Sequence, residues 1–310
     1  MKVSVKVPAT SANLGPGFDC LGLALPIYNE ITVEETVMPG SGIEIIILDS
    51  DNKDAYDVLS IPKDKNNLAY KAIELLYNAI GQSVSDIKIT IKTNIPVARG
   101  LGSSASVIVG GLVAANELLG KPADSDLLLS IAAEVEGHPD NVTPALFGGF
   151  CISSMEDDGS VLYSKLDWPD DWKLTVLIPD YELDTRISRS VLPESISIPN
   201  AAFNVRKCAM LVDAVIRRDD KLMKKCLKDK LHQPYRANLI NGFKELEEAL
   251  SMKDDILGCV ISGAGPTILV ISKNNGFENV KNEVKQIFED FNVICDIRTL
   301  NVEKEGTKVI

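Results

Sequence analysis

Segments in which apolar and polar residues alternate recur along the chain, and this is the pattern of half-buried β-strands. Residues 3–7 alternate in this way before Pro8, and residues 87–91 do so before Pro96. Apolar runs flank the segment 262–266 and predict two more strands. Further strands are predicted at 27–37, 42–48, 174–178 and 293–297.

Apolar residues at helical spacing predict helices between these strands. One helix covers about 68–80, with Asn66 or Asn67 as its N-cap. A long apolar helix ends near 119, and the next one follows Asp124 and reaches about 136. Later helices are predicted at 201–217, 219–230, 238–250 and 276–289. Because strands and helices mix without a steady β-α-β-α rhythm, we predict an α+β fold rather than a doubly wound sheet.

The composition changes near residues 153–172, where acidic residues gather with Gly, Pro and Trp. Such a change is typical of a domain boundary. A chain of 310 residues is long enough for about two domains. We therefore predict an N-terminal domain over 1–158 and a C-terminal domain over 159–310.

Charge and composition exclude several classes of function. The chain has 32 Lys and Arg against 44 Asp and Glu, a net charge of −12, and no local basic stripe, so we expect no nucleic-acid partner. No apolar run reaches the roughly 18 residues of a membrane span, and no signal peptide is evident, so we expect no membrane association. Six cysteines are spread singly beside only two histidines. This pattern predicts reduced thiols, no zinc site and a cytoplasmic location.

The most informative segment is 96–105, PVARGLGSSA, between a predicted strand and a predicted helix. Glycines let a backbone approach a ligand closely, and the helix N-terminus offers unpaired N–H groups and about half a positive charge. Two serines there can cap the helix, bind phosphate oxygens or ligate Mg²⁺. The segment predicts an anion site, most often for phosphate, with a serine-capped turn as the alternative.

Two well-known phosphate loops differ from this segment. The Walker-A loop needs a Gly-Lys pair before Ser or Thr, and no such Lys is present. The dinucleotide pattern G-x-G-x-x-[G/A] matches at Gly100, Gly102 and Ala105. However, a turn at 120–124 and another helix follow, in place of a second strand that ends in an acidic residue. A dehydrogenase is therefore disfavoured.

A second polar cluster, 134–141 (EVEGHPDN), lies at the end of a predicted helix. Its oxygen ligands suit Mg²⁺ or a polar substrate, and a helix end with an Asx-type turn is the alternative. His138 suits a capping, packing or catalytic role equally. The segment 262–267 is by itself a tight turn. Three isolated arginines have roles that depend on context: Arg186, Arg189 and Arg236.

Together these segments resemble the GHMP kinase superfamily, and most closely its homoserine kinase branch. The loop 100–105 alone would fit any member of the superfamily, whereas the segments 8–19, 138–142 and 232–236 point to this branch. The matching motifs run in family order through nearly the whole chain, at 8–19, 100–105, 138–142, 185–193, 232–236 and 262–267.

The resemblance implies a β-rich, nucleotide-binding N-terminal domain, a ferredoxin-like C-terminal domain and a homodimer. It implies transfer of the ATP γ-phosphoryl group to the hydroxyl of L-homoserine in an interdomain cleft, with Mg²⁺, on the route to threonine. Its metal ligands map to Ser104 and Glu134, with Glu136 as the alternative. Its nucleotide-binding residues map to Asn67, Pro96, Val97, Ala98, Arg99, Gly100, Leu101, Gly102, Ser103, Ser104, Ala105 and Ser106.

The implied substrate-binding residues are Asn13, Asp19, Asp140, Asn141, Thr185, Arg189, Arg236 and Gly263. Paired arginines suit a carboxylate and paired aspartates suit an ammonium, which favours an amino-acid alcohol over mevalonate. The implied catalytic residues are Asp140, Asn141 and Ser104. Because no Lys partner for Asp140 is evident, we hypothesise that no strong base operates and that the hydroxyl proton leaves late, to the phosphate. A kinase for another alcohol and a non-catalytic nucleotide sensor are the alternatives.

Overall fold

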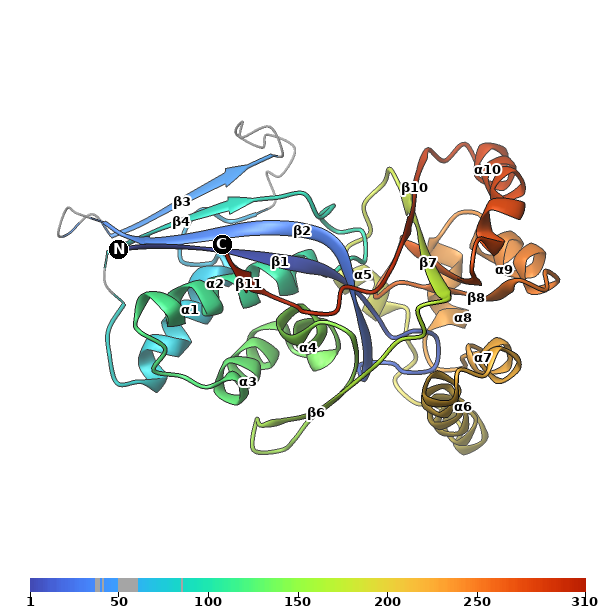
Figure 1. The fold of residues 1–310 in the computed structure, drawn as a ribbon, viewed down its shortest axis with the longest axis horizontal. Helices are drawn as coiled ribbons and strands as arrows, with labels where there is room; N and C mark the ends of the chain where they lie inside the picture. Colours follow the sequence, from blue (N-terminus) through green and yellow to red (C-terminus); the bar gives the residue numbers. More distant parts are fainter. Residues whose placement is uncertain (37–39, 41, 50–60, 85) are drawn as a thin grey trace.

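The computed structural model describes residues 1–36, 40, 42–49, 61–84 and 86–310, which build two sheets side by side (Figure 1). In the described residues the first sheet has the order β11-β1-β2-β4-β3, and β5 joins β2 and carries β6. Its neighbours are antiparallel except for β3 and β4, which are parallel. The strands are β1 Lys2–Ala12, β2 Leu21–Glu35, β3 Ile43–Leu48, β4 Ile87–Lys92, β5 Phe150–Met155, β6 Val161–Leu166 and β11 Lys308–Val309.

Four helices cover one face of the first sheet (Figure 1): α1 Leu68–Ala79, α2 Ser103–Leu118, α3 Ser125–Glu136 and α4 Pro139–Phe147. The predicted N-caps are confirmed, because Asn67 Oδ1 accepts the N–H of Ala69 at 2.9 Å and Asp124 Oδ1 accepts that of Leu127 at 2.9 Å. Helix α2 is buried on nearly all sides, between β1 and β2 on one side and α1 and α3 on the others. This packing fixes the position of its N-terminus, where the Gly/Ser loop ends.

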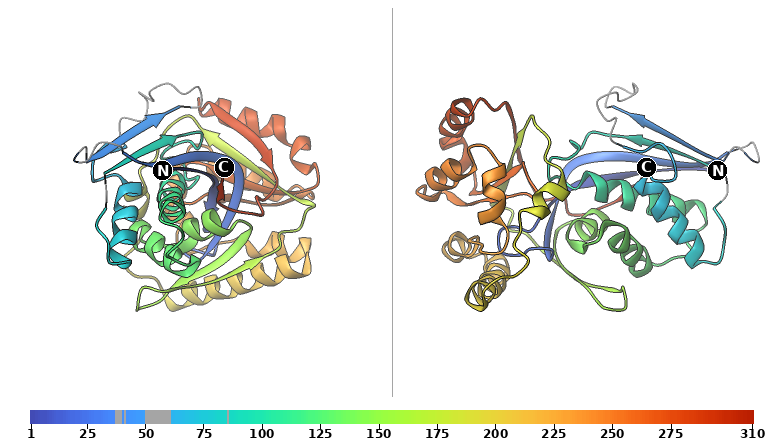
Figure 2. Two further views of the ribbon diagram at one scale, coloured as in Figure 1. Left: turned by 60° about the vertical axis from the view of Figure 1, so that its left-hand side comes forward. Right: turned by 180° about the vertical axis from the view of Figure 1, so that it is seen from behind.

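The second sheet has the order β10-β7-β9-β8 with every neighbouring pair antiparallel. Its strands are β7 Trp172–Pro179, β8 Ile256–Ile261, β9 Ile268–Lys273 and β10 Cys295–Leu300. Two crossovers, one between β7 and β8 and one between β9 and β10, contain the remaining helices (Figure 2). They are α5 Thr185–Ser190, α6 Ile198–Arg217, α7 Asp220–Cys226, α8 Gln233–Arg236, η2 Ala237–Leu239, α9 Phe243–Ser251, η3 Gly276–Asn279 and α10 Lys281–Asp290.

The β5–β6 hairpin spans the boundary predicted between 158 and 159. This point lies in the turn of the β5–β6 hairpin, whose six residue pairs run from Phe150↔Leu166 to Met155↔Val161. The acidic, Gly-containing segment is therefore a hairpin turn, and the first sheet continues to Leu166. The chain also returns to this sheet at its end, where β11 pairs with β1.

Other differences are local. The strand predicted at 27–37 begins earlier, at Leu21, and residue 37 lies outside the described residues. The helix predicted at 219–230 ends at Cys226, and the helix predicted at 276–289 is a 3₁₀ turn followed by α10. Helix α4 was not predicted, because Pro139 and Pro144 give the segment the composition of a loop. Two largely antiparallel sheets with helices packed against them agree with the predicted α+β class.

An apolar cluster joins the two sheets. It combines Leu21 and Leu23 of β2 with Trp172 of β7, Leu211 of α6 and Leu269 of β9. These side chains are nearly inaccessible to solvent, so the cluster holds the two halves together beside the polar loops. No helix in the described part of the chain has both the length and the apolar character that a membrane span requires.

Candidate active site

The Gly/Ser loop leads into α2 without a side-chain cap. Gly100 and Gly102 have positive φ values of 75° and 67°, and Gly102 is the N-cap residue. Neither serine caps the helix, so the first N–H groups of α2 keep their capacity to bind an anion. The alternative of a serine-capped turn is therefore wrong.

Both glycines of the loop are pressed against neighbouring segments. A Cβ on Gly100 would lie 2.3 Å from the carbonyl oxygen of Ser262, and a Cβ on Gly102 would lie 1.9 Å from Thr10 Oγ1. Real Cβ atoms do not approach other atoms so closely. The loop is thus held between β1 and the turn at 262–265, and this close approach requires glycine.

A cavity of about 270 Å³ extends from this loop to the polar residues of the second half. Its lining comes from the loop after β1, the Gly/Ser loop, the α3–α4 junction, α5, α8 and the turn after β8. The predicted residues that line it are Asn13, Asp19, Asn67, Val97, Ala98, Arg99, Gly100, Leu101, Gly102, Ser103, Ser104, Asp140, Asn141, Thr185, Arg189, Arg236 and Gly263. The structure thus brings together residues that are far apart in the sequence.

Three predicted nucleotide-binding residues lie outside this lining: Pro96, Ala105 and Ser106. Ala105 belongs to the core of the first half. Ser106 is buried, and its Oγ donates to the carbonyl oxygen of Ser103 at 2.7 Å and accepts from Asn29 Nδ2 at 2.8 Å. The side chains of Ala105 and Ser106 therefore pack beneath the loop and support it.

Of the two glutamates named as metal-ligand candidates, the alternative Glu136 reaches the loop, and Glu134 does not. Ser104 Oγ lies 2.6 and 2.8 Å from the two carboxylate oxygens of Glu136. Glu134 is exposed and lies outside the lining, because two residues along a helix place side chains on different faces. Burial raises the pKa of Glu136, and the hydrogen bond from Ser104 and the charge of His138 oppose this. A desolvated carboxylate beside a hydroxyl is a donor set that fits Mg²⁺.

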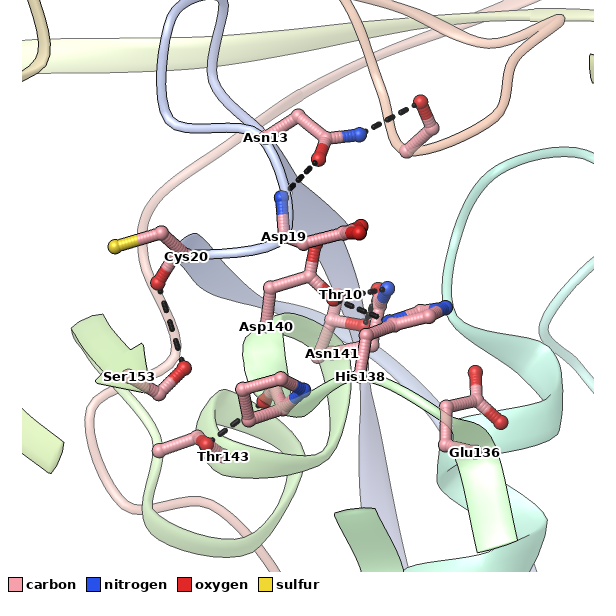
Figure 3. Close-up of polar contacts among 12 residues, drawn as sticks. Thr10, Asn13, Asp19, Cys20, Glu136, His138, Asp140, Asn141, Thr143 and Ser153 are labelled. Atoms are coloured by element: carbon pink, nitrogen blue, oxygen red, sulfur yellow. Dashed lines mark hydrogen bonds and ion pairs between the residues drawn. The ribbon is translucent and has the colours of Figure 1, made fainter. Parts of the chain in front are cut away.

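Asp19, His138 and Asp140 converge on the cavity (Figure 3), and one ligand atom from each lies within 4.8 Å of the others. His138 Nδ1 lies 2.6 Å from Asp140 Oδ1. Burial alone would lower the pKa of His138, but this bond and the charges of Asp140, Glu136 and Asp19 raise it. A carboxylate oxygen accepts hydrogen bonds, so Nδ1 donates to Asp140, and the raised pKa favours the protonated ring. The sequence pattern had left the role of His138 open.

Arg189 faces Asp19 across the same cavity. Its Nη2 lies 2.8 Å from Asp19 Oδ1 and its Nη1 lies 3.2 Å from Oδ2, which is a two-pronged ion pair. Arg189 is partly exposed, and although burial lowers its pKa, the contact with Asp19 raises it.

Arg236 is almost fully buried beside Arg189. Its Nε donates to the carbonyl oxygen of Ser188 at 3.2 Å, and its Nη1 donates to that of Gly263 at 3.0 Å. Burial lowers the pKa of Arg236 to about 10, and the positive charge of Arg189 acts in the same direction. Arg236 therefore remains cationic at neutral pH and has a fixed orientation.

Three supporting residues were not identified from the sequence. Thr10 Oγ1 donates to Asn141 Oδ1 at 2.8 Å and so orients that amide. The ring of Phe18 lies 5.5 Å from Arg189 Cζ and 5.3 Å from Arg236 Cζ. The buried His232, whose pKa is lowered by burial, donates from Nε2 to the carbonyl oxygen of Gly15 at 2.7 Å. All three lie within the recognised motifs, but a motif does not show which of its side chains support the others.

Known proteins share this arrangement of loop and fold. Residues 67–149 match the model of the GHMP kinases N terminal domain, and residues 211–290 match the model of the GHMP kinases C terminal domain. These matches cover α1–α4 with the Gly/Ser loop and much of the second half.

The chain is 43% identical over 307 residues to a homoserine kinase from Clostridium botulinum (strain Langeland), covering 99% of this chain and 98% of that one. It is 38% identical to a homoserine kinase from Crocosphaera subtropica, with 99% and 97% covered. The crystal structure of homoserine kinase from Cytophaga hutchinsonii superposes with a TM-score of 0.89 at 30% identity, covering 100% of this chain and 97% of that one. The chain therefore belongs to the GHMP kinases and, among them, to the homoserine kinase family.

Proposed function

We propose that this chain transfers the γ-phosphoryl group of ATP to the side-chain hydroxyl of L-homoserine and yields O-phospho-L-homoserine for threonine biosynthesis. The observation that carries the proposal is a single cavity with an uncapped helix N-terminus at one end and paired acids and arginines at the other. The first end suits a triphosphate, and the second suits an amino acid.

The Gly/Ser loop would hold the triphosphate through the N–H groups of residues 100–104. Apolar Ile61, Leu68 and Val107 line the cavity near Asn67 and would contact the adenine ring. The amide of Asn67 is already engaged, because it caps α1 and donates to the carbonyl oxygen of Pro62 at 2.7 Å. Asn67 would therefore line the adenine end of the cavity without forming a hydrogen bond to the base.

Ser104 and Glu136 would hold Mg²⁺. The bound ion would neutralise charge on the phosphates of ATP. In the structure Ser104 donates to the Glu136 carboxylate, which places the oxygens of both side chains at the loop.

The other end of the cavity would hold the two charged groups of L-homoserine. Arg189 and Arg236 would bind its carboxylate, while Asp19 and Asp140 would bind its ammonium. In the structure Arg189 and Asp19 satisfy each other. The substrate would take the place of each partner, its carboxylate at Arg189 and its ammonium at Asp19, so no charge would lose its partner.

The reacting hydroxyl would lie near Asp140 and Asn141. Asp140 Oδ1 already accepts from His138 and, at 3.2 Å, from Asn141 Nδ2. None of the described residues that line the cavity is a lysine. These contacts support positioning without a strong base, with the proton leaving late to the phosphate. An Asp140→Asn variant that lost only the chemical step, together with a titration of Asp140 in the wild-type pH–rate profile, would refute this hypothesis.

Four finer features complete the proposal. The strand order β10-β7-β9-β8, with helical crossovers, supports a ferredoxin-like second half. Lining residues from both halves support a cleft between them. A homodimer and a cytoplasmic location follow from the family resemblance and the reduced cysteines.

The proposal is tested by measuring ADP release with L-homoserine, L-serine, L-threonine and mevalonate as separate acceptors. We expect the highest kcat/KM with L-homoserine. Activity confined to mevalonate would favour a kinase for another alcohol. ATP binding without turnover on any acceptor would favour a nucleotide sensor, and either result would overturn the proposal.

A further inference from the structure

The fold brings together two of the six cysteines, Cys20 and Cys208, which are far apart in the sequence. Cys20 lies in the loop between β1 and β2, directly after Asp19, and Cys208 lies on α6. Both side chains pack against the apolar cluster that joins the two sheets, and the thiol of Cys208 donates a hydrogen bond to the sulfur of Cys20. We call these two residues the thiol pair.

A second contact places α6 against the same loop, independently of the sulfur atoms. Asn204 lies one turn before Cys208, so the two side chains share a face of the helix. Asn204 Nδ2 donates to the carbonyl oxygen of Pro16 at 3.2 Å. This face of α6 therefore contacts the loop at both Pro16 and Cys20.

The surroundings of the thiol pair favour oxidation. Cys20 and Cys208 are both partly exposed, so a small oxidant can reach them. The hydrogen bond from Cys208 lowers the pKa of the Cys20 thiol, although burial opposes this, and the same bond and burial raise the pKa of Cys208. A thiolate beside a second thiol is typical of redox-sensitive pairs, in which one sulfur is oxidised and the other closes the disulfide.

Cys295 is a useful comparison, because it is also partly exposed. Burial raises the pKa of its thiol to about 12, and its sulfur donates to the carbonyl oxygen of Asp296 at 3.7 Å. The Cys295 thiol is therefore protonated at neutral pH and reacts slowly with oxidants, since the thiolate is the nucleophile.

The thiol pair lies behind the substrate end of the cavity. Figure 3 shows the sulfur of Cys20 pointing away from the carboxylate of Asp19, and neither cysteine is among the described residues that line the cavity. The N–H of Asp19 donates to Asn13 Oδ1 at 3.0 Å, and Asn13 Nδ2 donates to the carbonyl oxygen of Gly263 at 3.0 Å. A shift of Cys20 is therefore transmitted to Asp19, its neighbour in the chain, and through Asp19 to Asn13.

We propose that Cys20 and Cys208 form a reversible disulfide when a hydroperoxide oxidises them, and that this bond weakens the binding of L-homoserine. The second part rests on the proposed function. A disulfide is about 2 Å long, which is shorter than any contact between two thiols, so its formation pulls Cys20 toward α6. Asp19 then moves with Cys20, away from the position in which it pairs with Arg189.

The oxidation takes two steps. The thiolate of Cys20 attacks one peroxide oxygen, so that an S–O bond forms, the O–O bond breaks, and the second oxygen leaves and takes up a proton. The sulfur of Cys208 then attacks the sulfur of Cys20, the S–S bond forms, and the S–O bond breaks, with the hydroxyl leaving as water together with the proton of Cys208. Each sulfur loses one electron, and the peroxide gains two. A dithiol reductant restores both thiols by exchange.

The first experiment maps disulfides in the full chain after treatment with hydrogen peroxide. Catalase removes the excess peroxide, an alkylating reagent blocks the free thiols, and the peptides are analysed by mass spectrometry without reduction. We expect a cross-link between Cys20 and Cys208 that dithiothreitol reverses. Cys295→Ser is the matched control and should form the same cross-link as the wild type. A wild type without a cross-link between Cys20 and Cys208 would overturn the proposal.

The second experiment measures the KM for L-homoserine and for ATP before and after the same treatment. In the wild type and in Cys295→Ser we expect the KM for L-homoserine to rise at least about fivefold and that for ATP to stay within about twofold, because only the substrate end is displaced. Dithiothreitol should reverse the rise, and Cys208→Ser should show none. An unchanged KM in the cross-linked wild type, or an equal rise in Cys208→Ser, would overturn the proposal. If the reduced enzyme does not phosphorylate L-homoserine, the proposed function fails, and the cross-link alone then decides whether the thiol pair is oxidised.

Discussion

The two ends of the cavity differ in the chemical groups that they present: backbone N–H groups at one end and charged side chains at the other. At the phosphate end, residues 100–104 offer backbone N–H groups and a helix N-terminus, with Glu136 as the nearby charge. At the substrate end, charged side chains from several elements converge: Asp19, His138, Asp140, Arg189 and Arg236. Under the proposed function, one end would bind through backbone geometry, and the other would bind through paired charges.

This difference follows from what each ligand presents. A phosphate has the same shape in every nucleotide, so a rigid loop suffices, and close packing against Thr10 and Ser262 keeps that loop rigid. An amino acid is recognised by two opposite charges at a fixed separation. Each charge in an empty site must then be paired until the substrate arrives, and the Arg189–Asp19 and His138–Asp140 pairs meet this need.

The largest effect is expected where the two ends touch. Gly100→Ala would place a Cβ against the backbone of Ser262 and Gly265, next to the Gly263 carbonyl that orients Arg236. We expect kcat/KM to fall at least about 100-fold, with weaker binding of both substrates. The alanine would strain the backbone at a positive φ and would also displace the neighbouring turn. Steady-state kinetics with each substrate varied in turn measures this.

Gly120→Ala is the matched control for that variant. Gly120 also has a positive φ, of 79°, but an added Cβ would meet nothing within 4 Å. The Gly120→Ala variant therefore strains the backbone at a positive φ but displaces no neighbouring residue. It should keep near-wild-type KM values. Equal losses in the two variants would show that close packing of the loop does not matter.

The next effect is confined to the phosphate end. Glu136→Gln removes the charge that faces Ser104, and we expect kcat to fall by up to about 100-fold, at the lower end of what the loss of one group that stabilises transition-state charge costs. Glu134→Gln, on the exposed face of α3, should retain wild-type kcat. A loss in Glu134→Gln with normal activity in Glu136→Gln would return the metal site to the original assignment.

A smaller effect is expected at the substrate end. Arg189→Gln should raise the KM for L-homoserine about tenfold and leave the KM for ATP within about twofold, because one charge-assisted contact is lost at a partly exposed site. Arg186→Gln is the control, since Arg186 is 92% exposed and bonds Asp184 outside the cavity. A rise in the KM values for both L-homoserine and ATP in Arg189→Gln would contradict the claim that the two ends bind their ligands independently.

The smallest effect concerns pH. The pKa of His138 is raised in the folded protein, so the stabilisation by its pair with Asp140 is fully present below about pH 6.5 and is lost as pH rises through the folded pKa. The difference in the free energy of unfolding between the wild type and His138→Gln should therefore shrink as the pH rises above about 6.5. Urea denaturation at several pH values measures it. A constant or growing difference would mean that the pair carries no charge.

Much of the site could be predicted because its residues lie in local motifs. The Gly/Ser loop was identified from Gly100 and Gly102, since positive φ and close backbone approach leave few other choices. The α3 residues illustrate the limit. Choosing Glu136 over Glu134 needs the orientation of α3 relative to α2, which is a tertiary contact.

Other features depend on interactions far along the chain. The first sheet continues beyond the predicted boundary because β6 pairs with β5, and β11 returns to pair with β1. The sequence left His138 open between a capping, a packing and a catalytic role, and only the fold places it near Asp19. Sequence patterns show which residues are present, and the packing of helices and sheets decides which of them meet.

The central claim is that the two ends bind their ligands separately. Titration calorimetry with L-homoserine alone and with a non-hydrolysable ATP analogue plus Mg²⁺ tests it on Arg236→Lys and Ser104→Ala. Arg236→Lys should weaken L-homoserine binding at least about tenfold and leave the nucleotide within about twofold, because a lysine cannot reproduce the planar guanidinium contacts. Ser104→Ala should show the reverse pattern. If either variant weakens both ligands equally, or if the wild type does not bind L-homoserine, the account is wrong.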